Sequence, residues 1–317
     1  MNISKKLLYA VSSGVLLALG WPSIGSLFPL LFVALVPLFL LERNVAAAQE
    51  NGSKEKLFPY VYLSIFIFNT LTTWWVWNAS PFGAIMAVIL NSLFLALAFQ
   101  LAHYSRKNVG AFRGDLALVF FWIAWEYFHM DWDLSWTWLT LGNGLANAPS
   151  IIQWYEYTGV FGGSLWILLS NLFVVHWLEK SKKYSSKFYQ LPGLIFSLKW
   201  IALIIIPSAF SVIVFYGYEE IVDPVEVVVV QPNIDPYNEK FGGLSSEDQV
   251  QKMFDLAYSK STQTTEFVVF PETAIPNGIN EEIFKETPEY QIIEKFCIDY
   301  PNTQVVIGAS TFVVYES

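Results

Sequence analysis

The sequence predicts a polytopic α-helical membrane domain of about seven spans, followed by a partial α/β domain. One observation is composition: 54% of the 317 residues are hydrophobic, 17% are aromatic and only 14% are charged, which is far too apolar for an ordinary soluble protein. The other is the distribution of charge. Residues 1–216 carry 13 Lys and Arg against 9 Asp and Glu, whereas residues 217–317 carry 5 against 18. We therefore expect a membrane domain over 1–216 and a second domain over 217–317.

Seven apolar runs account for the membrane domain. A bilayer core needs about 20 apolar residues per helix, and fewer where flanking side chains reach the interface. The runs cover 7–21, 24–41, 57–77, 81–104, 116–130, 159–178 and 194–216. The basic start at Lys5 and Lys6 makes a secretory signal peptide the competing interpretation of the first run, but the run that follows at once favours a retained helix.

Loop charge predicts the orientation, because Lys and Arg are retained on the cytoplasmic side of a membrane. With the amino terminus inside, every basic residue before position 217 falls at a cytoplasmic end. These residues are Lys5, Lys6, Arg43, Lys54, Lys56, Arg106, Lys107, Arg113, Lys180, Lys182, Lys183, Lys187 and Lys199. An odd number of spans then places everything after residue 216 on the far side.

Three predicted outer segments are rich in aromatic residues: the turn at Trp21, the stretch 74–77 and the loop 132–154. The common interpretation is an aromatic belt at the membrane interface. The functional alternative is a lipid-facing rim around a site where acyl chains enter.

Glu126 is an ionisable group late in the run 116–130, where isolation from water is costly and such residues are usually paired or functional. Because Glu126 lies near the outer interface, a structural hydrogen bond to a neighbouring loop is the alternative to a role in binding. The histidines His103, His129 and His176 lie near the ends of apolar runs, far apart in sequence. We interpret them as packing residues and expect no metal site.

Residues 217–317 alternate between strands and helices. Strands are predicted over 225–230, where Glu226 interrupts a β-branched run, over 267–270 and over 304–308. Helices are predicted over 246–261, with Ser245 as the cap and Asp248 three residues later, and over 288–300. This order is typical of a parallel sheet. The lone Cys297 excludes an intrachain disulfide, and we place it on the apolar stripe of the second helix.

Glu272 is the candidate catalytic residue. The apolar run 267–270 shows no alternation, as in a strand that is buried on both faces, and Pro271 ends it. Glu272 therefore follows the carboxyl end of a strand, where layered α/β folds present catalytic groups. A partly desolvated carboxylate there is suited to act as a general base. The alternative is a solvated turn residue.

The segment Pro271-Glu272-Thr273-Ala274-Ile275-Pro276 resembles the part of the nitrilase superfamily that holds its catalytic glutamate, in the version found in apolipoprotein N-acyltransferases. The stretch 230–234, Val-Gln-Pro-Asn-Ile, resembles the end of the first strand of that nitrilase-like domain.

Other matches extend the resemblance over essentially the whole chain. Phe241 follows Lys240 where the family often has Lys-Trp, and Trp138 opens a stretch similar to the family's periplasmic loop. Glu126 stands in a similar pattern, with His129 where an Arg is common.

The resemblance implies transfer of a fatty acyl group from a phospholipid to the α-amino group of a diacylglyceryl-cysteine at the start of a lipoprotein. It places the chain in the bacterial inner membrane with its carboxyl-terminal part periplasmic. Glu272 would accept the proton of a cysteine thiol, the thiolate would take the acyl chain as a thioester, and a lysine would help to hold the oxyanion. Trp138, Phe241 and Glu126 are the candidate substrate-binding residues. The implied partners are a phospholipid acyl donor, a diacylglyceryl-modified apolipoprotein and membrane lipid, with no cofactor and no nucleic acid.

The catalytic lysine and cysteine of the family come well after the glutamate, and Cys297, Lys285 and Lys295 do not match them. We therefore expect the amino-terminal portion of such an enzyme, inactive by itself, whose domain is completed by a missing segment or a second chain. A membrane-tethered amidase of nitrilase type is one alternative. A non-catalytic polytopic binding or transport protein is the other, although it would be expected to show intramembrane charges and inverted repeats.

Overall fold

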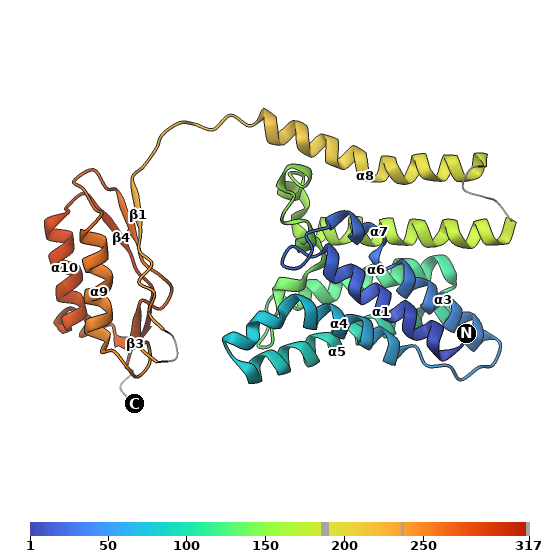
Figure 1. Cartoon of the computed structure of the whole chain (residues 1–317), viewed down its shortest axis with the longest axis horizontal. Helices are drawn as coiled ribbons and strands as arrows, with labels where there is room; N and C mark the ends of the chain where they lie inside the picture. The colour runs from blue at the N-terminus through green and yellow to red at the C-terminus, as the bar shows by residue number, and fades with distance from the viewer. Residues whose placement is uncertain (185–189, 236–237, 315–317) are drawn as a thin grey trace. The chain divides into compact units, whose positions relative to one another are not determined.

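The computed structural model describes residues 1–184, 190–235 and 238–314, and it divides into two compact units, Met1–Tyr218 and Glu219–Ser317 (Figure 1). Each unit is a separate body with its own hydrophobic core. Of the basic residues used to predict the orientation, Lys187 and the side chain of Lys183 lie outside the described residues.

The larger unit is a bundle of helices. They are α1 (Ile3–Gly20), α2 (Leu31–Ala34), α3 (Val36–Glu50), α4 (Phe58–Thr73), α5 (Pro81–Val109), α6 (Ala111–Phe128), α7 (Tyr155–Tyr184) and α8 (Leu191–Gly217). The 3-10 turn η2 (Trp74–Asn78) continues α4. α4 packs between α1 and α5, α6 packs on α5, and α8 lies along α7 (Figure 1). α7 contains a break at Gly159, whose φ of 62° suits a residue without a Cβ.

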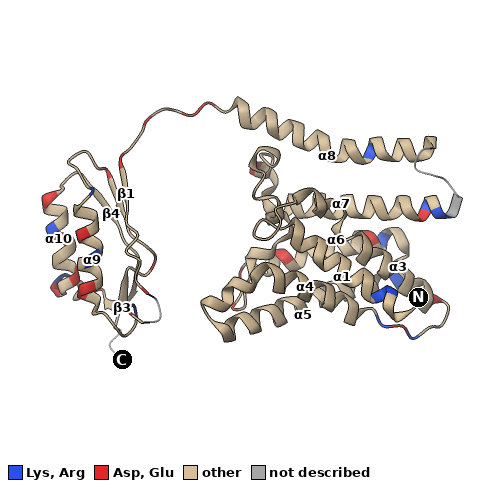
Figure 2. Ribbon diagram, viewed as in Figure 1, with Lys and Arg blue, Asp and Glu red and all other residues tan. Residues whose placement is uncertain are grey.

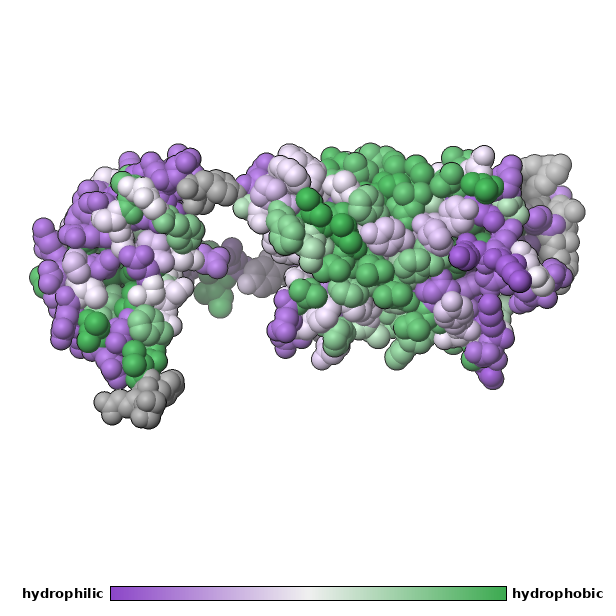
Figure 3. Space-filling model, turned by 90° about the horizontal axis from the view of Figure 1, so that it is seen from below, coloured by the Kyte–Doolittle hydropathy of each residue, from purple (hydrophilic) through white to green (hydrophobic). Residues whose placement is uncertain are grey.

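Among the described residues, five segments are long and apolar enough to cross a membrane: Ile3–Gly20, Phe28–Glu50, Pro81–Val109, Tyr155–Lys182 and Leu191–Gly217. The sequence predicted seven. The difference lies in α4, which has 16 residues, and in α6, which carries Arg113, Asp115 and Glu126. Figure 3 shows apolar side chains over the middle of this unit and polar ones gathered at one end.

A buried ionic cluster joins four helices at that end of the unit, where Figure 2 shows Lys and Arg to gather. Asp115 of α6 accepts from Arg43 of α3 at 2.6 Å and from Arg106 of α5 at 2.5 Å. Its second oxygen lies 2.6 Å from His176 Nε2 of α7. The Asp115 side chain is 4% exposed, and a charge so far from water requires such partners.

Glu42 of α3 extends this cluster. Its Oε1 lies 3.0 Å from Arg106 Nε and 2.8 Å from His103 Nδ1, and His103 is fully buried. Gln49 Oε1 accepts from the other ring nitrogen of His103 at 3.2 Å. His103 and His176 are therefore members of an ionic cluster, which is more specific than the packing role that the sequence indicated.

The smaller unit contains a three-stranded parallel sheet in the order β1-β2-β4. The strands are β1 (Val227–Val229), β2 (Phe267–Val269) and β4 (Gln304–Val306), and a separate parallel pair consists of β3 (Ile275–Asn280) and β5 (Ala309–Phe312). The helices α9 (Ser246–Tyr258) and α10 (Pro288–Asp299) lie on one side of the sheet (Figure 1). The predicted strand, helix, strand, helix, strand order is present, and β3 and β5 add a pair that the sequence did not indicate.

The core of this unit lies between the sheet and its two helices. Val268, at the centre of β2, is fully buried against Phe254 of α9 and Phe296 of α10. The predicted cap of α9 is confirmed, because Ser245 Oγ accepts from the backbone N–H of Asp248 at 3.0 Å.

The opposite face of the sheet carries exposed apolar side chains. Val229 is 73% exposed and Val306 is 50% exposed. Phe267 and Val269 of β2 are only half-buried, so the prediction of a strand buried on both faces is wrong. The physical reason is that, within the described ranges, helices cover one face alone.

Glu226 lies just before β1, and its carboxylate accepts hydrogen bonds from the turn 262–265 at the amino edge of the sheet. The Thr265 hydroxyl donates to this carboxylate, and the hydroxyls of Thr262 and Thr264 each do so at 2.9 Å. These hydrogen bonds, that of Thr265 foremost, lower the pKa of the Glu226 carboxyl.

We predict that Asp115→Asn destabilises the membrane unit by about 3–5 kcal/mol, because it leaves two buried guanidinium groups without their shared anion. The matched control is Glu179→Gln. The Glu179 side chain also contacts Arg43, at 3.4 Å, but it is 45% exposed, so its loss is expected to cost less than about 1 kcal/mol. Thermal unfolding of the full chain in detergent measures both changes. Equal losses for the two variants would contradict the assigned role of Asp115.

Candidate active site at the carboxyl edge of the sheet

The carboxyl ends of β1, β2 and β4 lie at one edge of the sheet. The three strands are parallel and paired in register, with Val228, Val268 and Val305 level with one another. The hydrogen bonds between the strands continue one residue further. The N–H of Val230 donates to Val269 O, and the N–H of Phe270 donates to Val306 O, both at 2.9 Å. The segments that leave the strands are therefore neighbours at this edge.

Glu272 lies in the turn between β2 and β3, at the carboxyl end of the strand as the sequence predicted. Its side chain is exposed, so the expected partial desolvation is absent here. The turn is pressed against Gly308 in the segment after β4. A Cβ at Gly308 would lie 2.8 Å from Thr273 N, which is closer than real Cβ atoms approach, and 3.1 Å from Glu272 Cα, which is tighter than most of their contacts. The absence of a side chain at Gly308 thus sets how near the Glu272 backbone lies to β4.

Two residues at this edge have left-handed backbone conformations that are uncommon outside glycine. They are Asn233 after β1, with a φ of 50°, and Thr273 next to Glu272, with a φ of 52°. Such conformations cost about 1–3 kcal/mol each and cluster at functional sites. The strain supports a functional role for the edge that carries Glu272.

A cavity of about 110 Å³ adjoins the turn. It is lined by Gln231, Pro232, Asn233, Ile234, Lys240, Gln249, Met253, Pro271, Thr273 and Ala274. Gln249 of α9 fixes one wall, because its Nε2 donates to the carbonyl of Lys240 at 2.9 Å. Lys240 thus brings a cation to the edge that also presents the Glu272 carboxylate.

Phe241, a candidate substrate-binding residue, does not line this cavity. Its ring is 70% exposed, beside the Lys240 ammonium, which lies 5.6 Å from the ring centroid. The segment that carries it folds back on Asp235, whose carbonyl accepts from the N–H groups of Glu239 and Lys240. Phe241 is therefore presented to solvent next to the cavity.

Glu126 and Trp138, the two candidates in the membrane unit, lie in different surroundings. Glu126 is buried, and its Oε1 accepts from Trp122 Nε1 at 2.9 Å and from the N–H of Leu141 at 2.7 Å. This carboxylate therefore ties α6 to the loop 132–154. Trp138 is half-exposed and stacks on Trp75, with 4.6 Å between ring centroids.

The three aromatic segments converge, as the sequence indicated. Trp138 joins the loop 132–154 to η2, and Asn147 of the same loop donates to Ser26 Oγ at 2.8 Å, near the turn at Trp21. Trp21 itself is buried and packs edge-on against Phe68 of α4. One end of the membrane unit is therefore an aromatic platform, opposite the end that holds the Asp115 cluster.

A small polar cavity lies beneath this platform. It measures about 30 Å³, large enough for a water molecule, and it is lined by residues that include Asn69, Asn91, Glu126, His129 and Trp136. Within the described part of the chain, Asn69 Oδ1 and Trp136 Nε1 have no hydrogen-bond partner. Sequence analysis missed Asn69, although a single amide inside an apolar run is a signal of this kind.

His129 belongs to the wall of that cavity. Its Nδ1 accepts from Trp132 Nε1 at 2.8 Å, and its other ring nitrogen donates to Asn91 Oδ1. Both nitrogens are thus used in hydrogen bonds to neutral groups, as in a packing residue. No group of three or more His, Cys, Asp or Glu side chains suited to a metal ion occurs in the described ranges.

These features define a class of protein: a helical membrane protein with several candidate spans that carries a small α/β unit with an exposed carboxylate at its sheet edge. Comparison with known proteins identifies the family of the membrane unit. The family model described as the apolipoprotein N-acyltransferase N-terminal domain matches residues 13–173.

Three curated relatives are similar over most of the chain. The apolipoprotein N-acyltransferase of Chlorobaculum tepidum is 31% identical over 280 residues, which are 86% of this chain and 50% of the relative. That of Geobacter metallireducens is 26% identical over 96% of this chain and 57% of its own length. The apolipoprotein N-acyltransferase 1 of Treponema denticola is 27% identical over 84% of this chain and 48% of its own length.

The chain belongs to the apolipoprotein N-acyltransferase family and corresponds to the amino-terminal portion of its members. It spans about half the length of the curated relatives that it matches.

We predict that Gly308→Ala destabilises the carboxyl edge of the sheet by about 1–3 kcal/mol, because the new methyl group meets backbone atoms that cannot rotate away. Hydrogen exchange of the full chain measures the effect as faster exchange of amides in β2 and in the turn that follows. Gly242→Ala is the matched control, since nothing lies within 4 Å of a Cβ at that position. Unchanged protection in Gly308→Ala would show that the close approach does not hold the turn.

Proposed function

We propose that the chain supplies the membrane-embedded half and the general base of an enzyme that transfers a fatty acyl group from a phospholipid to the amino terminus of a diacylglyceryl-modified apolipoprotein. The observation that carries this proposal is Glu272 at the carboxyl edge of a parallel sheet, held there by the contact with Gly308. A thiol with an ordinary pKa of about 8.5 needs such a base nearby to become a nucleophile at neutral pH.

The proposed chemistry has two steps. Glu272 takes the proton of a cysteine thiol, and the thiolate attacks the ester carbonyl of the phospholipid. The lysophospholipid leaves as an alcohol after it receives a proton, and the acyl group remains as a thioester. The free α-amino group of the lipoprotein then attacks the thioester, which forms the amide and returns the thiol.

Cys297 does not supply this thiol. Contrary to its predicted place on the apolar stripe of α10, it is exposed. It lies in the last turn of a helix that leads to the amino end of β4, whereas Glu272 follows the carboxyl end of β2. Partial desolvation, with the neighbouring Glu294, raises the pKa of the Cys297 thiol, which is the wrong direction for a nucleophile.

We infer that the thiol and the oxyanion lysine come from polypeptide outside residues 1–317, and that the same polypeptide covers the open sheet face at Val229 and Val306. An exposed apolar face of this kind is typical of an interaction surface. The greater length of the curated relatives supports this inference. The unit 219–317 is accordingly the start of an extracytoplasmic nitrilase-like domain.

An apolar groove supports a phospholipid acyl donor. It measures about 490 Å³ and lies between α4 with η2 and α5, close to the aromatic platform. It is lined by Phe66, Thr70, Thr73, Trp74, Trp77, Asn78, Ala84, Ile85, Val88 and Ile89. We propose that an acyl chain lies in this groove, with Trp138 near its path and Glu126 holding the loop in place. Phe241, an exposed aromatic residue of the smaller unit, remains a proposed substrate-binding residue.

The proposed topology has seven spans with the amino terminus in the cytoplasm of a bacterial cell. It counts α4 continued by η2, and α6, as crossings in addition to the five long apolar segments. The basic end with the Asp115 cluster then faces the cytoplasm, in keeping with the retention of Lys and Arg on that side.

The first test joins the chain to the part of the Chlorobaculum tepidum relative that it does not cover. We expect the fusion, in phospholipid vesicles, to add one acyl chain to a diacylglyceryl lipopeptide, as detected by mass spectrometry. Glu272→Gln in the fusion should lower the rate by about 10²–10⁴-fold, the usual contribution of a general base, with little effect on folding because the side chains have the same shape. The exposed Glu282→Gln is the control.

The alternatives give different results in the same assay. The chain alone should add no acyl group, and acylation that Cys297→Ser abolishes would contradict the assignment of the thiol. Hydrolysis of a soluble amide without phospholipid would favour an amidase. Full activity of Glu272→Gln would overturn the role of Glu272.

A second test concerns orientation. In a Cys297→Ser background, we expect Asn277→Cys, at an exposed position on β3, to react with a membrane-impermeant maleimide in intact spheroplasts. Lys54→Cys, in the exposed loop after α3, should react only after lysis. The reverse pattern would show that the α/β unit is cytoplasmic.

A further inference from the structure

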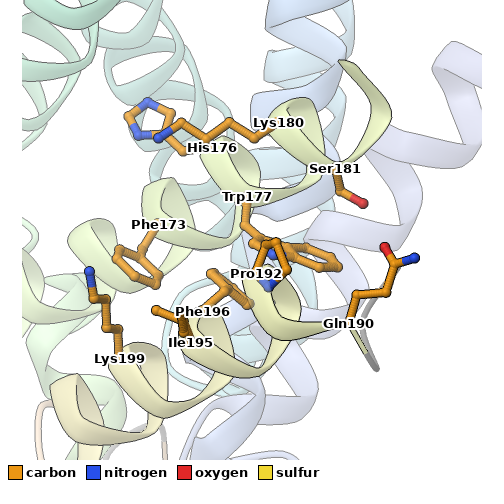
Figure 4. A pocket seen from close by; sticks show the side chains of 10 residues that line it. All are labelled: Phe173, His176, Trp177, Lys180, Ser181, Gln190, Pro192, Ile195, Phe196 and Lys199. Carbon is orange, nitrogen blue, oxygen red and sulfur yellow. The ribbon is translucent and has the colours of Figure 1, made fainter. Parts of the chain in front are cut away.

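A cavity of about 620 Å³ lies between α7 and α8, at the basic end of the membrane unit (Figure 4). It is lined by Phe173, His176, Trp177, Lys180, Ser181, Gln190, Pro192, Ile195, Phe196 and Lys199. The two helices supply facing walls, so the cavity is distinct from the Glu272 edge and from the groove beside α5. Neither of the steps proposed above uses it.

Contacts between the helices define the walls of this cavity. Phe196 of α8 stacks on Phe173 and on Trp177 of α7, with ring centroids 5.1 Å and 4.7 Å apart. Deeper in the bundle, Trp200 Nε1 donates to Ser170 Oγ at 2.8 Å and fixes the register of the two helices. The cavity is therefore held by specific packing.

The charges of the cavity are positive. Lys180 comes from α7 and Lys199 from α8, and the described residues that line the cavity include no Asp or Glu. In the part of the chain that the structure describes, neither lysine forms an ion pair, whereas Arg43 and Arg106 nearby share Asp115. Lys180 and Lys199 thus provide two cations without a paired anion, beside walls that are apolar and aromatic. This combination is suited to a ligand that has an anionic head and an apolar body.

The cavity opens to the surface that faces lipid. α8 is the least buried of the five long apolar segments, and its buried residues are Gly193, Phe196 and Ser211 alone. Leu194 and Leu198 beside the cavity are more than half exposed. Lys180 lies one turn before the end of α7, and Lys199 lies about 12 Å along α8 from its start, at 1.5 Å per residue. Lysines at these depths reach headgroup level through their flexible stems.

We propose that this cavity binds an anionic phospholipid that does not react, with its phosphate between Lys180 and Lys199 and its acyl chains along Phe173, Ile195 and Phe196. Basic pockets between membrane helices are the usual sites for such headgroups. The proposal does not depend on the acyltransferase function, because none of these side chains belongs to the proposed chemistry.

The test reconstitutes the full chain in phosphatidylcholine vesicles that contain a minor fraction of phosphatidylglycerol, and measures the lipid that stays bound by native mass spectrometry. We expect phosphatidylglycerol to be retained in preference to phosphatidylcholine. Lys180→Ala with Lys199→Ala should lower that preference roughly 25-fold, because each lysine near the membrane surface favours an anionic lipid about fivefold. Lys180→Arg with Lys199→Arg should keep it.

The control is Lys107→Ala with Lys182→Ala, which removes the same charge at the same end of the unit from lysines that are likewise exposed but do not line the cavity. An equal loss in this control would show general surface attraction and overturn the site. If the double alanine variant kept its preference for phosphatidylglycerol and its native unfolding temperature, the proposed site would also be refuted. Displacement of phosphatidylglycerol by inorganic phosphate at matched concentration would identify a free anion as the ligand and would also refute the lipid proposal.

Discussion

The pairing of Asp115 with two arginines is the constraint on which the membrane unit depends. An isolated carboxylate or guanidinium in an apolar bundle is unstable, whereas a group of them with complementary hydrogen bonds can be retained. Asp115 brings Arg43 and Arg106 to one point, and His176 approaches its second oxygen. Because these residues come from α3, α5, α6 and α7, neutralising the buried charge also fixes how those helices meet.

The two ends of the membrane unit are stabilised in different ways. The basic end uses ion pairs, and Lys180 and Lys199 of the cavity between α7 and α8 are among the cations there that the described residues leave without an ion pair. The aromatic end uses indole stacking and one buried carboxylate, Glu126, whose two hydrogen bonds hold the loop 132–154 over α6. Ion pairs link neighbouring helices to one another at the basic end. Aromatic side chains at the other end pack a long loop and can also face lipid. The difference is in keeping with the proposal that the aromatic end receives an acyl chain.

The sequence predicted features that depend on local pattern and missed those that depend on contact between distant residues. Pro271 directly follows the apolar run 267–270 and has no N–H to donate to the ladder, so the position of Glu272 followed from its neighbours. Gly308 was not identified, because its role depends on the turn that holds Thr273, which is distant in sequence: a Cβ at position 308 would lie 2.8 Å from Thr273 N. His103 was taken as a packing residue because its partner Glu42 lies 61 positions away.

Two further errors have local causes. Cys297 was placed with Phe296 on the apolar stripe of α10, but one residue turns a helix by about 100°, and this rotation carries the thiol to the surface. The pair β3 and β5 was missed because Gly278 and its neighbours Pro276 and Asn277 have low strand propensity. In both places tertiary packing decided the outcome.

The exposure of Glu272 and the exposure of the open sheet face have one explanation. A general base acts best where water is excluded, yet Glu272 is in contact with solvent, and apolar Val229 and Val306 are exposed on the face that α9 and α10 leave free. A layer of polypeptide over that face would bury the valines, and where it continued past the carboxyl edge it would enclose the carboxylate. Hydrophobic burial and the assembly of the catalytic group would then be a single event, so the general base would become effective only in the completed domain.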